Sequence, residues 1–262
     1  MILPKFAFRG SWPAAAALAG MASLCISTAS AQVLVKKDNQ WRYSLGAGAS
    51  LSSGNSSARS VNVTAEALKA TAQDKWTISG RMLYAKNDNE TTADQASLGA
   101  RFDRDLSRDW FVFGSGEWMR DRPANLAQRF SASVGPGYHV YQADSGYFDV
   151  FGGVGYTRDE LVAPKVIADE LRSRYGRAEL LLGEESQHQW TDTTTFKQRL
   201  VLYPNLQDTG SFRGMFETGL AVAMNKRLNL TASLAYRYNN DPGDGIKKAD
   251  LLFVTGIAVK IE

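Results

Sequence analysis

The segment LNLTASLAYRY, residues 228–238, decides the fold class that the sequence predicts. Apolar or aromatic residues occupy every second position, and four of the five positions between them carry Asn, Thr, Ser or Arg. Successive side chains of a β-strand point to opposite faces, so this spacing gives one apolar and one polar face. The length also suits a tilted strand that crosses a bilayer, which needs about 10 residues.

The same alternation recurs along the chain, and the helical spacing of three and four residues fails in these windows. Near the start, for example, Trp41, Tyr43 and Leu45 alternate with Arg42 and Ser44. The predicted strands are 41–51, 58–70, 75–86, 94–104, 110–120, 129–141, 147–158, 173–186, 194–203, 212–224, 228–239 and 250–261. The sequence therefore predicts an all-β fold, an antiparallel up-and-down transmembrane β-barrel of about 12 strands.

Short and longer connections tend to alternate between the predicted strands. The short set is 71–74, 105–109, 142–146, 187–193 and 225–227. The other set includes the longer 159–172 and 240–249, with 52–57 as a short exception. An outer-membrane barrel with both ends in the periplasm has short periplasmic turns and longer external loops, so the pattern favours that class.

Composition excludes several classes of protein. The 262 residues carry a net charge of +3 that is spread along the chain, which argues against a nucleic-acid binder. One Cys excludes a disulfide scaffold and any multi-thiolate metal site, and two His leave little scope for histidine metal chemistry. The oxygen-rich residues between 239 and 250 are more typical of a turn than of a calcium site. We therefore expect no cofactor and no metal.

The first 31 residues have the features of a cleaved secretory signal peptide. Lys5 and Arg9 precede an apolar stretch at 12–26, and Ala29-Ser30-Ala31 is a small-x-small cleavage motif. We expect residues 1–31 to be removed and residues 32–262 to form the outer-membrane β-barrel domain.

Alternation alone does not say which face lies inside the barrel. A soluble periplasmic barrel of the lipocalin kind would turn its apolar face inward around an apolar ligand. Twelve strands, however, enclose more space than apolar side chains readily fill. Aromatic residues also gather near the predicted strand ends, as an interfacial girdle requires. These aromatic residues are Trp41, Tyr43, Trp76, Tyr84, Trp110, Trp118, Tyr138, Phe148, Tyr156, Tyr236 and Tyr238.

In a membrane barrel the polar face lines the lumen, and this face is heavily charged. The candidate lumen-lining charges are Arg42, Glu66, Arg81, Arg101, Asp103, Glu117, Arg129, Asp149, Arg177, Glu179, Glu185, Lys197, Arg199, Arg213, Glu217 and Arg237. Opposite charges in a confined space pair, with Arg bridging carboxylates. Two interpretations stay open: a structural network that fills the lumen, and a narrow charged path for small polar solutes.

Catalysis would need a base within hydrogen-bond reach of a nucleophile. The histidine candidates are His139, expected to face the lumen beside Ser133, and His188, expected at a periplasmic turn. Such histidines more often serve as hydrogen-bonding residues, and the sequence has no Gly-x-Ser-x-Gly elbow or phosphate loop. We therefore expect no enzyme, and no catalytic, cofactor-binding or metal-binding residue. A lipid-modifying barrel enzyme is the alternative from a different class.

Several short motifs follow one another along the predicted barrel. They are Ser53-Gly54-Asn55-Ser56, Arg101 through Ser107, Glu117 through Arg129, Gly135-Pro136-Gly137-Tyr138, Gly183-Glu184-Glu185 and Lys247-Lys248-Ala249-Asp250. In order and spacing they resemble the YdiY-like family of salt-induced outer-membrane proteins, a domain of unknown function (number 481). The resemblance implies an outer-membrane barrel linked to salt or osmotic stress, with no established activity.

Together these features predict a protein exported to the bacterial outer membrane, with a structural or narrow-channel role. The expected partners are outer-membrane lipid and lipopolysaccharide, the barrel-assembly machinery, and small ions or polar solutes. Nucleic acid is not expected as a partner.

Overall fold

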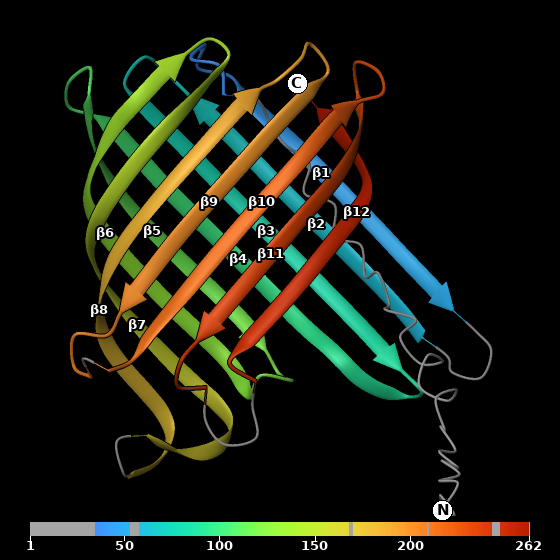
Figure 1. The fold of residues 1–262 in the computed structure, drawn as a ribbon, viewed down its shortest axis with the longest axis vertical. Coiled ribbons are helices and arrows are strands. Elements are labelled where there is room, and N and C mark those ends of the chain that lie inside the picture. The colour runs from blue at the N-terminus through green and yellow to red at the C-terminus, as the bar shows by residue number, and fades with distance from the viewer. Residues whose placement is uncertain (1–34, 53–57, 168–169, 209, 243–246, 262) are drawn as a thin grey trace, which may run out of the picture.

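The computed structural model describes residues 35–52, 58–167, 170–208, 210–242 and 247–261. The described residues form twelve antiparallel strands that close into a barrel (Figure 1). The strands are β1 (Trp41–Ser52), β2 (Ala58–Ala70), β3 (Asp74–Asn87), β4 (Glu90–Asp105), β5 (Trp110–Asp121), β6 (Leu126–Ala143), β7 (Gly146–Ile167), β8 (Glu170–Gln189), β9 (Thr194–Pro204), β10 (Phe212–Ala223), β11 (Leu228–Asn239) and β12 (Ala249–Ile261). The predicted fold class is confirmed, and the predicted signal peptide lies outside the described residues.

The barrel has two unlike ends. At the terminal rim, uppermost in Figure 1, β1 begins and β12 ends, and the register pairs Tyr43 with Ile261. The connections at the terminal rim are short, for example two residues between β6 and β7. At the opposite end, the loop rim, lie the connection from β9 to β10 and that from β11 to β12. The predicted alternation of short and longer connections is therefore present in the structure, with two differences.

The first difference is that residues 159–172 are not a loop. β7 continues to Ile167 and β8 starts at Glu170, so the two strands extend past the loop rim as a hairpin (Figure 1). Asn125, in the turn between β5 and β6, holds this extension. Its backbone oxygen accepts from Val162 N at 3.1 Å, and its side chain exchanges hydrogen bonds of 2.8 and 2.9 Å with the backbone of Ala163. Sequence alternation did not reveal this support because it comes from another strand pair.

The second difference is the tight connection between β3 and β4. The prediction left residues 87–93 between strands, whereas the structure needs only Asp88 and Asn89 for the turn. Both residues have positive φ values, 45° and 71°. Two-residue hairpin turns require such angles, and Asp and Asn tolerate them better than most residues. The polar composition that suggested a loop therefore encodes a turn.

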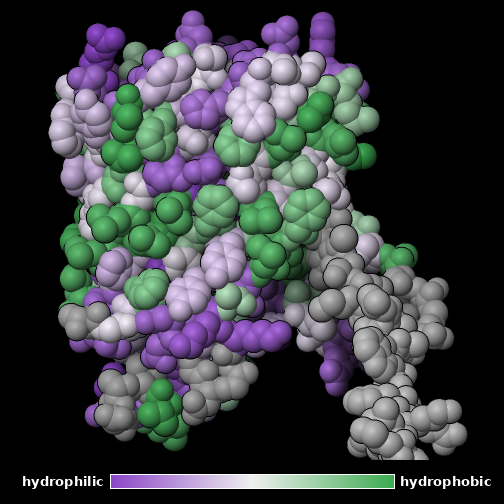
Figure 2. All heavy atoms as spheres, viewed as in Figure 1, coloured by the Kyte–Doolittle hydropathy of each residue, from purple (hydrophilic) through white to green (hydrophobic). Residues whose placement is uncertain are grey.

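The wall of the barrel is apolar on the outside and polar on the inside. In β2, the side chains of Ser60, Asn62 and Thr64 are buried, whereas Val61 and Val63 between them are 55% and 45% exposed. Figure 2 shows hydrophobic residues gathered across the middle of the visible wall and hydrophilic residues gathered at its two rims. This polarity is the reverse of that in a water-soluble barrel, where the apolar face is inside.

Aromatic side chains pair near the rims. At the terminal rim Trp110 meets Tyr138 with ring centroids 5.1 Å apart, and Trp76 meets Phe102 at 4.6 Å. Toward the loop rim lie further exposed aromatic residues, among them Tyr84. Aromatic rings with one apolar and one polar part suit the interface between lipid and water at both levels.

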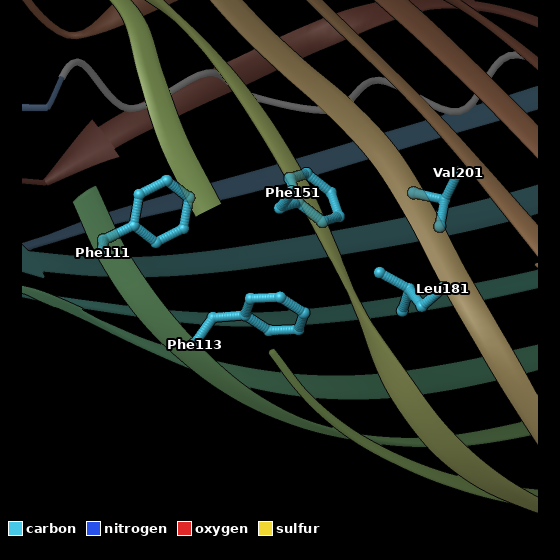
Figure 3. Packing of buried hydrophobic residues seen from close by; sticks show 5 residues of the cluster. All are labelled: Phe111, Phe113, Phe151, Leu181 and Val201. Carbon is cyan, nitrogen blue, oxygen red and sulfur yellow. The ribbon is translucent and has the colours of Figure 1, made fainter. Parts of the chain in front are cut away.

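A small apolar cluster lies inside the barrel across β5 to β9 (Figure 3). It consists of Phe111, Phe113, Phe151, Leu181 and Val201, each at most 6% exposed. The rings fit because glycines stand opposite them. A Cβ atom on Gly137 would lie 2.1 Å from Cζ of Phe111, and one on Gly183 would lie 2.6 Å from Phe151. The Gly135-Pro136-Gly137 motif thus leaves room for an aromatic side chain of the neighbouring strand.

Replacing Gly137 with Ala should therefore destabilise the barrel by about 1–3 kcal/mol, because the buried Phe111 ring has to move. The measurement is the temperature at which the folded, fast-migrating band converts to the unfolded band on a gel. Gly116→Ala is the matched control, since no heavy atom lies within 4 Å of the added Cβ. Equal stability of the two variants would contradict the packing argument.

Candidate functional site: the charged lumen

The lumen contains a cavity of about 430 Å³ whose lining is rich in charge. Ten basic and seven acidic side chains of the described residues line it. Predicted residues in the lining are Glu66, Arg81, Arg101, Glu117, Arg129, Glu179, Glu185, Lys197, Arg199, Arg213, Glu217 and Arg237. The lining therefore carries a small excess of positive charge.

Four of the predicted charges lie outside this lining. Arg42, Asp103, Asp149 and Arg177 are each at most 6% exposed and hydrogen-bond other polar groups instead. Arg177 lines a second, smaller cavity of about 80 Å³ toward the loop rim. These residues face the interior, but their side chains contact these polar groups instead of the main cavity.

Several lining charges were missed by the sequence analysis. Lys75 and Asp121 follow the inward alternation of β3 and β5, so their positions carried a usable signal. Lys247 and Lys248 come from the connection before β12, where no strand periodicity exists. Asp159, which was assigned to a loop, is buried in the extended β7.

One network of charges runs along the wall from β6 to β10. Arg129 donates to both oxygens of Asp159 at 2.5 and 2.7 Å, and Arg177 donates to the same carboxylate at 2.9 Å. Arg177 also donates to Glu179 at 2.8 Å, and Arg213 donates two hydrogen bonds to the Glu179 carboxylate, of 3.1 and 2.7 Å. Bidentate Arg–carboxylate contacts are the strong, directional kind. This series connects β6 with β7, β7 with β8, and β8 with β10, past the intervening β9.

A second network surrounds Arg101. Its guanidinium lies 4.2 Å from the ring centre of Phe113 and 4.5 Å from that of Phe151, and it donates to Asp103 at 2.8 Å. Lys75 reaches the same Asp103 at 3.6 Å. A guanidinium between two aromatic faces is held by cation–π attraction as well as by its ion pair. Arg101 is thereby fixed at the edge of the cavity.

Small side chains line the cavity on β3 to β7. Serine and glycine recur at inward positions there, and two cross-strand hydroxyl pairs form: Ser115 with Ser133 at 2.7 Å, and Ser131 with Thr157 at 3.0 Å. Short side chains occupy little of the lumen, so the free volume lies beside this wall. Their hydroxyl groups also offer hydrogen bonds to water or to a polar solute.

His139 lies near the terminal rim, where two carboxylates bind it. Nδ1 is 2.7 Å from Asp149 and Nε2 is 3.1 Å from Asp105. Its ring stacks on Phe111 with a centroid distance of 4.7 Å. The expectation that His139 lies beside Ser133 is wrong: they are six positions apart along β6, and Ser133 pairs with Ser115. His188 lies near the same rim but within β8 and not at a turn as expected, and its ring is 6.1 Å from that of Tyr141.

Residues 35–40 form a strap at the terminal rim. Asn39 N donates to the Ala70 oxygen at 2.8 Å, and Lys37 reaches Asp105 at 3.5 Å. Arg42 donates to Asp38 at 2.9 Å, and this hydrogen bond lowers the pKa of the Asp38 carboxyl to about 2. The strap is therefore tied to β1, β2 and β4.

No group of three or more His, Cys, Asp or Glu residues in the described part of the chain is arranged to hold a metal ion. Asp244, part of the oxygen-rich segment considered for calcium, lies outside the described residues. Among the same described residues, no helix is long and apolar enough to cross a membrane.

The profile of a family described as "Protein of unknown function, DUF481" matches residues 45–261. The chain belongs to this family. The suspected resemblance is therefore confirmed over nearly the whole barrel. Among curated proteins, none matches this member of the DUF481 family.

Solved structures with a similar fold are β-barrels of low sequence identity. The translocator domain of the autotransporter NalP from Neisseria meningitidis is 14% identical, with a TM-score of 0.45 over 85% of this chain and 87% of that one. The NanC porin is 13% identical, with a TM-score of 0.44 over 84% of this chain and 96% of that one.

The wall network gives a prediction about stability. Asp159→Asn should destabilise the protein by about 3 kcal/mol, because the buried Arg177 and the partly buried Arg129 lose a shared carboxylate. The neighbouring Glu160 pairs at 3.2 Å with Arg174, whose side chain is 67% exposed, and accepts from Gln128 at 2.6 Å, a bond that an amide oxygen can also accept. Glu160→Gln should therefore change stability by less than about 1 kcal/mol. Urea unfolding in lipid vesicles measures both. A larger loss for Glu160→Gln would contradict the assignment of the network.

Proposed function

We propose that this DUF481 protein is an outer-membrane β-barrel that provides a narrow passage for small polar solutes. The observation that carries the proposal is the polarity of the wall, with apolar side chains outside and charged or hydroxyl side chains around a cavity inside. A bilayer favours such a wall because lipid solvates the apolar face, and closure of the sheet satisfies the backbone hydrogen bonds.

The passage is supported by the shape and chemistry of the cavity. Its lining includes Lys75 and Tyr147 near the terminal rim and Pro242 and Lys247 near the loop rim. The cavity is polar, and its lining residues lie near both ends of the barrel. Such a cavity suits the transfer of water-soluble molecules better than the binding of an apolar ligand.

We infer a non-enzymatic role. Both ring nitrogens of His139 already contact carboxylates, so neither is directed at a hydroxyl nucleophile. The soluble alternative also receives no support, because an apolar ligand would need the apolar face inside. We further infer that outer-membrane lipid, lipopolysaccharide and the barrel-assembly machinery are its partners. The link to salt or osmotic stress rests on the family resemblance alone.

A lipid-facing charge tests the membrane placement. Val63→Arg introduces a charge at an outward position within the wall and should destabilise the vesicle-embedded barrel by about 2–4 kcal/mol. Val166→Arg is the matched control, since Val166 is 60% exposed but belongs to the hairpin beyond the loop rim. Urea unfolding in vesicles compares the two variants. Equal effects at both positions would place the wall in water rather than in lipid.

Planar-bilayer recording of protein purified from outer membranes tests the passage. Discrete current steps are expected, because a polar, charged cavity favours the entry of water and ions over an apolar one. Insertion is checked on the same sample by heat-modifiable gel mobility. A protein that inserts and stays silent would leave the barrel as a structural element of the envelope.

A further inference from the structure

Two ion pairs cross the lumen instead of following its wall. Glu66 on β2 binds Lys197 on β9 at 3.4 Å, and Arg81 on β3 binds Glu217 on β10 at 3.2 Å. In the order of the closed barrel, each pair joins strands with four others between them on one side and six on the other. These side chains therefore meet from nearly opposite walls.

The two pairs lie next to each other. On β2 and β3 the register sets Glu66 against Ser79 and Thr64 against Arg81, which are successive inward positions. On β9 and β10 it sets Lys197 against Gly219 and Arg199 against Glu217, again successive inward positions. All four charged residues line the main cavity. We call Glu66, Arg81, Lys197 and Glu217 the cross-lumen bar.

The bar differs from the wall network in its contact with water. The carboxylates of Glu66 and Glu217 are 14% and 30% exposed, whereas those of Asp159 and Glu179 in the wall network are 9% and 3% exposed. The cations follow the same order, with 23% and 28% for Arg81 and Lys197 and at most 17% for the arginines of the wall network. Ion pairs that keep contact with water contribute less net stability than their close geometry suggests. A solute or an ion can therefore replace one partner at small cost, which a buried wall pair does not allow.

From this geometry we propose that the cross-lumen bar is the charge- and size-selecting element of the passage, and that the solutes it admits are small anions. This inference rests on the proposed passage. Anions are favoured because basic residues outnumber acidic ones in the lining, ten to seven, and Arg199 stands opposite Glu217 in the register of β9 and β10. An entering anion binds Lys197 or Arg81 in place of its carboxylate partner, Glu66 or Glu217, and that carboxylate is then hydrated.

Selectivity is measured as the reversal potential of single channels under a KCl gradient. Wild-type protein should favour chloride over potassium. The double variant Glu66→Gln with Glu217→Gln should conduct more and favour chloride further, because two cations lose their partners. Arg81→Gln with Lys197→Gln should also conduct more but shift toward potassium, each permeability ratio changing by about fivefold.

Replacing chloride by the larger anion gluconate tests size selection. Gluconate should lower the wild-type current more than that of the Glu66→Gln, Glu217→Gln variant, in which the bar is broken. The exchange Glu66→Lys with Lys197→Glu rebuilds the pair in reverse and should retain wild-type conductance.

Asp94→Asn is the control, since Asp94 pairs with Arg120 at 2.7 Å, and both residues occupy outward positions of the wall. It should leave the reversal potential unchanged. Heat-modifiable mobility shows which variants are folded.

The outcomes separate the bar from the passage. If wild-type channels conduct and neither double variant moves the reversal potential, the bar inference is overturned while the passage stands. If the wild type is silent and the Glu66→Gln, Glu217→Gln variant conducts, the bar is supported as a closing element and the wild-type passage is not. If both insert and stay silent, both inferences fail.

Discussion

Closure of the sheet between β1 and β12 is the constraint on which the rest of the structure depends. An open sheet would leave two rows of backbone N–H and C=O groups without partners, which neither a hydrocarbon environment nor a stable barrel permits. The register from Tyr43–Ile261 to Ala47–Ile257 makes this seam, and it is shorter than the register of any other strand pair. Once it is closed, every inward position of twelve strands shares one confined interior. The charges on those positions then have to find partners among themselves.

Confinement explains why the same residue types form two kinds of contact. Where strands are adjacent, as for Arg129 and Asp159, side chains pair along the wall and lose most of their contact with water. Where long side chains extend from facing walls, as for Arg81 and Glu217, they meet in the open lumen and stay hydrated. The first kind resists disruption because a buried charge without a partner is costly. The second kind exchanges readily, because water compensates either partner.

The strands and the inward set of charges could be read from the sequence because both follow a period of two. Segment 228–239, for instance, is β11 in the structure with unchanged bounds. The extension of β7 and β8 could not be read in this way, since Asn125 on a different strand pair holds it. The sequence also did not indicate which charged residues pair with one another. Arg81 and Glu217 are 136 residues apart, and only the closed order of strands brings them together.

The uneven interior supports the proposed passage better than it supports simple filling of the lumen. A lumen selected only to be filled favours apolar side chains, as in the Phe111 cluster, because they pack densely without needing partners. That cluster is confined to β5, β7, β8 and β9, whereas serine and glycine on β3 to β7 leave volume beside it. Each buried charge needs a partner to offset its desolvation. A charged and partly empty lumen therefore contributes less to the stability of a barrel than a packed apolar one. This arrangement is understandable if the space and the charges serve the molecules that enter it.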